Sequence, residues 1–473
     1  MNSRFDRRKL SLVQKSASWY NSRKAAKKRP SGRCKTDRFL KRAVRQEALN
    51  IKKGRLIFVL CIGCLLMLTA CGGVSLTGQN VEELLRAPQL STMQNAVQTA
   101  LNHYLGETLQ LKYPRGGEEM APFLFEDFDG DGAQEAAVLY TTEAGAKTVN
   151  IAVLEQDGSD WLVAYNLPGL GAEVAQAQVV TLTEGGKQLV IGYANANLTE
   201  KYLVAYGYAD DQLHVMTTQA YDAYTAQDLF DTGLQQLLLV PPATQPGALS
   251  MQVYDGSSGE VTLRQTLLLD ERLTRCTALD ATQSGRRRGI VVSAELSAGG
   301  TANQVVCADD GALVLWPKDH PEDVVEASSR TNDALTVRDL WQRGTLYIPC
   351  LPGSFSTQST SQRYYAVEWR DYLSNGSTGQ FGIFDSTSGV YVRVPLYWKG
   401  EIQLEDGLEE NVWRICQKST GETLVVLRIG TNETPLGAYQ MLRTKGSVAV
   451  MALFGEGCTP SERSILQTGI QFF

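Results

Sequence analysis

Four carboxylates fall within nine consecutive residues, 127–135, in the order Asp-Phe-Asp-Gly-Asp-Gly-Ala-Gln-Glu. Ca²⁺ is a hard cation that binds six to eight oxygens, so carboxylates at alternate positions can converge on one ion when the loop curls around it. Gly132 permits the sharp reversal that this curl needs. The candidate ligands of one calcium ion are four side chains and one backbone carbonyl: Asp127, Asp129, Asp131, Glu135 and Ala133.

The loop is shorter than that of an EF-hand, whose closing Glu stands at position 12, because that position here is Val138. It resembles the calcium loops of FG-GAP and VCBS-type β-propeller repeats, in which a strand follows at once, as the apolar segment 136–140 does here. The resemblance implies the four carboxylates as side-chain ligands. The alternative is an acidic hairpin turn without metal. Three Asp and one Glu repel one another unless they are neutralised, which favours one calcium ion in a structural role.

A weak internal repeat surrounds this loop. Five times a turn segment with a glycine precedes a short apolar strand, in segments 127–140, 181–193, 228–240, 279–292 and 339–348. The central glycines lie 54, 47, 52 and 59 residues apart. A period near 50 with short paired strands is typical of four-stranded propeller blades. The sequence therefore predicts a mainly β, β-propeller-like domain of about five blade-like repeats, and the alternative is a β-sandwich whose hairpins merely look alike.

Two further segments frame the repeats. Apolar residues at helical spacing, Met93, Val97 and Leu101, predict a helix from Ser91 to Leu105, so the helix and the propeller-like domain together cover residues 91–373.

The remaining residues, 380–473, predict a small α+β domain, because several strands precede a capping box that begins at Thr459 and opens a last helix. Within it the segment 392–400 (VRVPLYWKG) resembles the hairpin of PsbP-like extracytoplasmic domains.

The N-terminal part carries an export signal. An apolar run from Leu56 ends in Leu68-Thr69-Ala70-Cys71 and follows the basic residues Lys52, Lys53 and Arg55. As a helix this run would span only about 20 Å, short of the ~30 Å hydrocarbon core. The pattern resembles the lipobox of bacterial lipoproteins.

That resemblance implies several things. Residues 1–70 are a signal peptide that is removed, Cys71 is lipidated with palmitate-type acyl chains, and residues 71–90 form a tether. The protein is then anchored in the cell membrane by its N-terminal lipid, with its body on the extracytoplasmic face. The alternative is an uncleaved transmembrane anchor.

Charge is unevenly distributed along the chain. The first 55 residues hold 19 Lys and Arg against 3 acids, whereas the whole chain carries −6, so the exported part carries about −22. The basic arm indicates either a misassigned start codon, with the true start near Val44 or Ile51, or a cytosolic arm that binds nucleic acid or anionic lipid. The acidic exported part argues against nucleic acid as its partner and is compatible with cation binding.

Signals for catalysis are weak. Three His, at 103, 214 and 320, are far apart, and five scattered Cys after Cys71 predict buried thiols rather than a disulfide framework. No GxSxG, phosphate-binding or dinucleotide-binding motif occurs. We therefore expect a non-enzymatic binding or scaffold role toward an unknown envelope protein or glycan. The alternatives are a solute-binding lipoprotein of a transporter and an envelope polysaccharide or peptide hydrolase.

Lipidation yields the first prediction. Cys71→Ala removes the thiol that would accept the lipid, so we expect this variant to accumulate as a heavier, unlipidated precursor. Mass spectrometry of the native protein measures the processed N-terminus directly. Native protein with residues 1–70 still attached would contradict the prediction.

Overall fold

Short antiparallel strands make up most of the protein, as the alternating apolar runs predict. The computed structural model describes residues 90–143, 147–331, 334–351, 363–374, 379–407, 409, 411–431 and 437–473. Cys71 and the expected signal peptide and tether lie outside these residues. Within the described ranges, no helix is long and apolar enough to cross a membrane.

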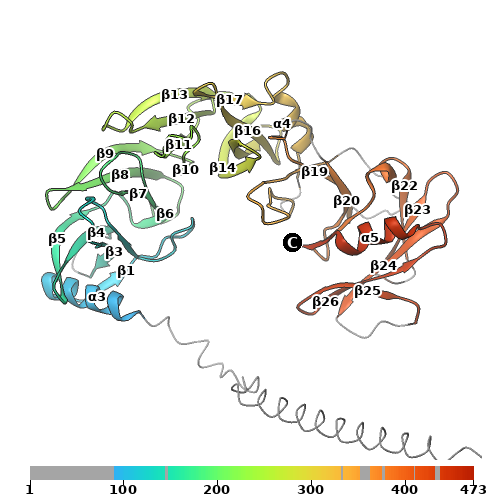
Figure 1. Cartoon of the computed structure of the whole chain (residues 1–473), viewed down its shortest axis with the longest axis horizontal. Coiled ribbons are helices and arrows are strands. Elements are labelled where there is room, and N and C mark those ends of the chain that lie inside the picture. The colour runs from blue at the N-terminus through green and yellow to red at the C-terminus, as the bar shows by residue number, and fades with distance from the viewer. Residues whose placement is uncertain are drawn as a thin grey trace, which may run out of the picture. The chain divides into compact units, whose positions relative to one another are not determined.

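Four consecutive sheets are antiparallel, and we call them blades 1 to 4 (Figure 1); blades 2 to 4 are four-stranded meanders. Blade 1 comprises β1 Leu109–Leu111, β2 Phe123–Glu126, β3 Glu135–Thr142, β4 Asn150–Asp157 and β5 Asp160–Pro168. Blade 2 comprises β6 Glu173–Val180, β7 Gln188–Ala194, β8 Lys201–Ala209 and β9 Gln212–Ala220. Blade 3 comprises β10 Ala223–Gln227, β11 Gln236–Val240, β12 Ser250–Asp255 and β13 Thr262–Leu268. Blade 4 comprises β14 Leu273–Ser284, β15 Arg287–Leu296, β16 Thr301–Asp309 and β17 Ala312–Trp316.

Burial within each blade explains its sequence pattern. The second strand is covered on both faces, so β7 and β11 are buried at every residue and read as continuous apolar runs. The fourth strand is open on one side, so β13 is largely exposed. Apolar clusters join consecutive blades: one spans blades 1 and 2, the next blades 2 and 3, and a third blades 3 and 4. The blades therefore pack face to face, which confirms the β-propeller-like expectation.

A fifth sheet continues the series. Blade 5 comprises β18 Ile348–Cys350, β19 Tyr364–Arg370, β20 Gln380–Asp385, β21 Val390–Arg393 and the last strand of the chain, β27 Ile470–Phe472. β20 pairs with β19, and β27 returns to pair with β21. The domain boundary expected between residues 373 and 380 therefore falls inside one sheet, because hydrogen bonds between distant segments cross it.

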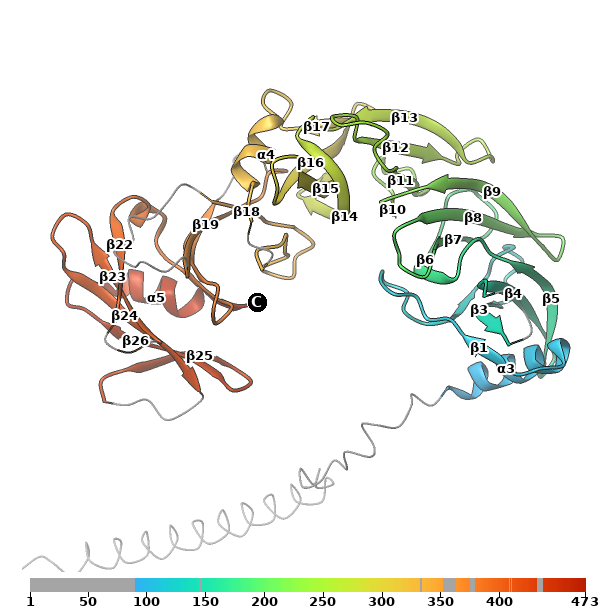
Figure 2. The same cartoon turned by 180° about the vertical axis from the view of Figure 1, so that it is seen from behind.

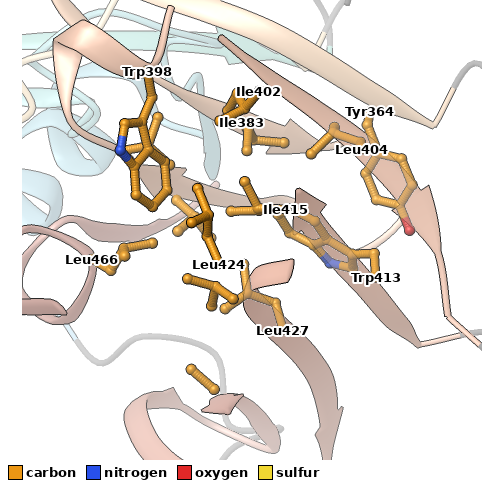
Figure 3. Packing of buried hydrophobic residues seen from close by; sticks show 14 of the residues in the cluster. Tyr364, Ile383, Trp398, Ile402, Leu404, Trp413, Ile415, Leu424, Leu427 and Leu466 are labelled. Atoms are coloured by element: carbon orange, nitrogen blue, oxygen red, sulfur yellow. The ribbon is translucent and has the colours of Figure 1, made fainter. Parts of the chain in front are cut away.

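The C-terminal segment adds a sixth sheet and a helix. The sheet comprises β22 Ile402–Asp406, β23 Val412–Gln417, β24 Thr423–Thr431, β26 Val448–Phe454 and β25 Gln440–Lys445. A short 3-10 helix, η1 Leu396–Trp398, precedes it, and helix α5 Pro460–Thr468 follows it. Both sheets and α5 share one core, in which the Trp413 ring lies 5.1 Å from the Tyr364 ring (Figure 3).

One helix precedes the repeat series and another lies between blades 4 and 5. Helix α3, Thr92–Leu105, begins at a capping box between Ser91 and Gln94 and buries Val97 and Leu101 against blade 1. Helix α4, Glu322–Ser328, follows blade 4 and packs on β16. The helices expected near both termini, α3 and α5, are confirmed, because each begins at a capping box and buries apolar residues. Helix α4, which has no side-chain cap, was not predicted.

The repeat turns stack on one another from blade to blade. Lys187 N–H donates to the Asp127 carbonyl across blades 1 and 2, and Gln235 N–H donates to the Thr181 carbonyl across blades 2 and 3. At the first joint the backbones approach so closely that a Cβ on Gly186 would lie 2.3 Å from the Phe128 carbonyl oxygen. This contact requires glycine, and it holds the acidic loop against blade 2.

Glycine substitution tests this joint. Gly186→Ala adds a steric clash to the strain of its positive φ of 125°, whereas Gly233→Ala, at φ 84°, meets no atom within 4 Å. We expect Gly233→Ala to cost on the order of 1 kcal/mol of stability and Gly186→Ala about 1–3 kcal/mol more. Denaturant unfolding of the two variants measures the difference, and equal midpoints would show that the blades do not meet as closely as this.

Candidate functional site

The acidic loop is the connection between β2 and β3. The two strands end their pairing at Glu126 and Glu135, so residues 127–134 must reverse the chain. Gly130 and Gly132 take positive φ values of 80° and 92°, which tighten the reversal. The loop thus brings its two ends, and the carboxylates near them, to one side of blade 1.

Three of the four carboxylates converge. Oxygens of Asp127, Asp129 and Glu135 lie within 4.8 Å of one another. Asp131 is not part of this cluster: its side chain is exposed and accepts a hydrogen bond of 2.6 Å from Ala133 N–H. Ala133 is also exposed.

Hydrogen bonds inside the loop shape the cluster. Asp127 accepts from Gly130 N–H at 2.7 Å and from Gly132 N–H at 3.1 Å, and Asp129 accepts from Asp131 N–H at 3.0 Å. These bonds leave each carboxylate with further lone pairs for a cation.

Glu135 is the buried member of the cluster. Only 3% of it is exposed, and its Oε2 accepts a 2.7 Å hydrogen bond from Phe128 N–H. Desolvation by burial, followed by repulsion from Asp129 and the neighbouring acids, raises the pKa of Glu135 to about 7, against the opposing hydrogen bond from Phe128. The ionised form of this side chain is therefore costly without a nearby cation.

The other turns show that the carboxylate at position 135 is not needed for folding the turn. Gln188 in blade 2 accepts from Leu182 N–H, and Gln236 in blade 3 accepts from Leu229 N–H, each at the start of the second strand. A neutral amide oxygen therefore makes the same bond. The charge on Glu135 calls for a separate explanation.

Asp127, in contrast, has a shared structural role. Asp228 and Asp339 each accept a hydrogen bond from the glycine five residues later, at 3.0 Å and 2.6 Å, as Asp127 does. The first turn differs from the third at two positions in the cluster, where Phe230 replaces Asp129 and Gln236 replaces Glu135.

Neutralisation distinguishes the two turns further. In the third turn Arg288 of blade 4 reaches Asp231 at 3.0 Å and Asp228 at 3.5 Å. Asp127, Asp129 and Glu135 have no such ion pair with any described residue. Their all-oxygen ligand set suits a hard cation such as Ca²⁺, which would replace the missing positive charge.

The remaining candidates for chemistry are less favourable. The five Cys are all buried and unpaired, as expected from their scatter. Burial raises the pKa of the Cys276 thiol to about 12 and that of Cys307 to about 11, so both stay protonated and are poor nucleophiles. His103 and His214 are exposed. The His320 ring nitrogen Nδ1 lies 3.3 Å from a carboxylate oxygen of Glu322.

A second candidate site was not foreseen from the sequence. A cavity of about 500 Å³, which we call the inner-strand pocket, is lined by the first strands of blades 2, 3 and 4, namely β6, β10 and β14. Its polar residues include Gln178, Tyr221, Asp222 and Asp280. They are spread over about a hundred residues of sequence, so no local motif connects them. The sequence carries no clear signal for this pocket, because Tyr221 and Asp222 lie in the connection between β9 and β10, and only Gln178 and Asp280 lie in strands.

Comparisons with known proteins add little. No protein-family model and no curated protein matches the chain. Among solved structures, a putative 6-phosphogluconolactonase from Bacteroides uniformis is 9% identical, with a TM-score of 0.31 over 67% of this chain and 93% of the other. The exotype rhamnogalacturonan lyase YesX is 12% identical, with a TM-score of 0.28 over 67% of this chain and 64% of the lyase. TolB from Acinetobacter baumannii is 14% identical, with a TM-score of 0.22 over 70% of this chain and 65% of TolB. Scores this low carry no argument about the function of this chain.

Calcium dependence is the next prediction. Binding to the folded state alone stabilises by RT ln(1 + [L]/Kd), about 2.7 kcal/mol at a hundredfold excess over Kd. Millimolar Ca²⁺ should therefore raise the melting temperature of metal-free protein, and a chelator should reverse the rise. Asp129→Ala should abolish the shift, whereas Asp231→Ala in the third turn should retain it.

The variant Glu135→Gln tests calcium binding separately from the hydrogen bond that shapes the turn. Glutamine can keep the hydrogen bond to Phe128, as Gln188 and Gln236 do in their own turns, but it removes one negative charge. We expect metal-free stability at least equal to that of the wild type together with loss of the calcium shift. A wild-type melting curve indifferent to Ca²⁺ would mean that the loop is only an acidic turn, and a full shift in Glu135→Gln would mean that Glu135 is not a ligand of the ion.

Proposed function

We propose that this chain is a lipid-anchored extracytoplasmic protein with a non-enzymatic binding or scaffold role, whose propeller-like domain is braced by one structural calcium ion. The observation that carries the proposal is the unbalanced first turn. It holds three converging carboxylates without a basic partner among the described residues, while the matching third turn has Arg288.

The place of the loop supports a structural role for the ion. Asp127 carries the carbonyl that accepts from Lys187 N–H of blade 2, and Gly130 lies against Gly185 of the same blade. A cation in this loop would neutralise repulsion at the joint between the first two blades. Calcium would then stabilise the repeat series from its N-terminal end, rather than act on a substrate.

The chemistry of the described side chains supports binding over catalysis. The thiols are buried and protonated, and the histidines lie on separate elements. Three α-helices and one short 3-10 helix accompany the strands of the described chain, so the alternating strands and helices that a two-lobed solute-binding protein needs have no counterpart there. Anchoring at Cys71 rests on the lipobox resemblance and places the partner, an envelope protein or glycan, outside the cytoplasmic membrane.

Affinity capture from native membranes tests the proposal. The full-length protein should retain a specific envelope protein or glycan in the presence of Ca²⁺. Asp129→Ala should lose that partner only to the extent that the variant unfolds, and Asp231→Ala should retain it. Turnover of envelope polysaccharide or peptide by the purified protein would contradict a non-enzymatic role. Loss of the partner by a fully folded Asp129→Ala variant would instead indicate that the ion is part of the partner-binding surface.

A further inference from the structure

A cavity lies between the fifth repeat turn and the last strand of the chain, and we call it the fifth-turn pocket. Its volume is about 390 Å³, which is within the range of small-molecule sites. The turn before β18 lines one side, and the other side is lined by β27, by Arg443 of β25 and by Thr468 at the end of α5. Figure 2 shows this turn beside the C-terminal end of the chain, which the letter C marks. Segments that are far apart in the sequence therefore meet at one cavity.

Arg338 is a partly buried cation of the lining without a hydrogen-bond acceptor. Its guanidinium lies 4.4 Å from the centre of the Phe473 ring, and its covered Nε has no hydrogen-bond partner in the described chain. Burial lowers the pKa of Arg338, because the charged form loses hydration and no described carboxylate is close enough to offset the loss. The backbone oxygen of Phe473 lies against Gly389 instead, where a Cβ would be 3.0 Å from it. An anion that accepts from the terminal nitrogens of Arg338 would compensate this desolvation.

Arg443 brings a second guanidinium to the pocket from a different sheet. It is exposed, and one Nη donates to the Ile470 carbonyl oxygen of β27. That bond orients the side chain, and the other N–H groups of Arg443 have no acceptor among the described residues. Because arginine presents its donors in a rigid planar fork, both side chains suit a carboxylate.

Two features of the pocket oppose an anion, but neither forms an ion pair with the arginines. Asp339 lines the pocket, and its carboxylate accepts from Trp341 N–H at 3.2 Å and from Gly344 N–H at 2.6 Å within the turn. Helix α5 ends at Thr468, where its dipole contributes about half a negative charge. The two guanidinium groups of the lining therefore remain without a carboxylate partner among the described residues.

We propose that the fifth-turn pocket binds a small molecule through a carboxylate group. A carboxylate accepts from Arg338 and Arg443, whereas a cation would be repelled and a neutral ligand would leave both charges unpaired. A single negative charge suits the pocket better than the two charges of a phosphate, because Asp339 adds a repulsive charge to the lining. The inference goes beyond the proposed function, because it assigns a ligand to blade 5, whereas the calcium loop belongs to blade 1.

Saturation-transfer NMR on the full-length protein with Ca²⁺ present tests this inference. The probes are benzoate and lactate, which carry one carboxylate on an aromatic and on a polar body. Their neutral counterparts are benzamide and lactamide, and inorganic phosphate serves as a competitor. We expect saturable binding of at least one acid and no binding of either amide. Phosphate at the concentration of the acid should not displace the bound acid.

Charge-neutral variants locate the site. Arg338→Gln and Arg443→Gln should each weaken binding of the acid about tenfold or more, because each loses a charge-assisted hydrogen bond. The control is Arg286→Gln, an exposed arginine in the turn between β14 and β15 and outside the pocket lining, whose affinity should match the wild type. Melting curves establish whether the variants are folded. Arg443→Gln loses one hydrogen bond to the backbone, so it remains informative even when Arg338→Gln is unstable.

Four outcomes would overturn the inference. They are no saturable binding of either acid, equal binding of an acid and its amide, displacement of the acid by phosphate, and unchanged affinity in folded Arg443→Gln. Each is distinguishable from failure of the proposed function, because calcium stabilisation and capture of an envelope partner are measured separately and do not depend on these probes.

Discussion

In the first three blades, a buried acceptor at the start of the strand that follows the repeat turn is the interaction on which the packing of the turns depends. When β2 turns into β3, β6 into β7 and β10 into β11, one loop residue near the start of each turn is buried, namely Phe128, Leu182 and Leu229, so its N–H is shielded from water. Glu135, Gln188 and Gln236 accept from the N–H groups that this burial would otherwise leave unpaired. The satisfied turns can then stack, so Lys187 and Gln235 donate across successive joints. Face-to-face packing of the apolar sheets follows from that register.

The first blade makes this interaction with a charged acceptor where its neighbours use a neutral one. A carboxylate with 3% exposure beside two further acids is electrostatically unfavourable, as the raised pKa of Glu135 reflects. The third turn resolves a similar accumulation of acids with an arginine from the next blade. The same backbone turn thus occurs with and without a basic partner for its acids. Among the described residues, only the third turn has a strand of the next blade that delivers a basic side chain to it.

The two candidate sites use different parts of a blade. The acidic loop belongs to the connection between first and second strands, where the chain reverses within one hairpin. The inner-strand pocket belongs to the first strands themselves, where three blades meet and each contributes polar side chains from a different sheet. The loop and the pocket therefore draw on different residues of a blade, so their sequences can vary independently.

Local features of this protein were determined by the sequence alone, because they depend on residues a few positions apart. The helix from Ser91, the capping box at Thr459, the turn glycines and the apolar second strands were predicted. Of the four carboxylates expected to converge in one hairpin loop, Asp127, Asp129 and Glu135 do so and Asp131 does not. Tertiary structure decided what depends on distant partners. β27 pairs with β21 and carries blade 5 across the expected domain boundary, Arg288 reaches the third turn from another blade, and Asp222 meets Asp280 in the lining of one pocket. Sequence spacing holds no signal for these contacts, because sheet register and blade packing bring their residues together only when the whole series has folded.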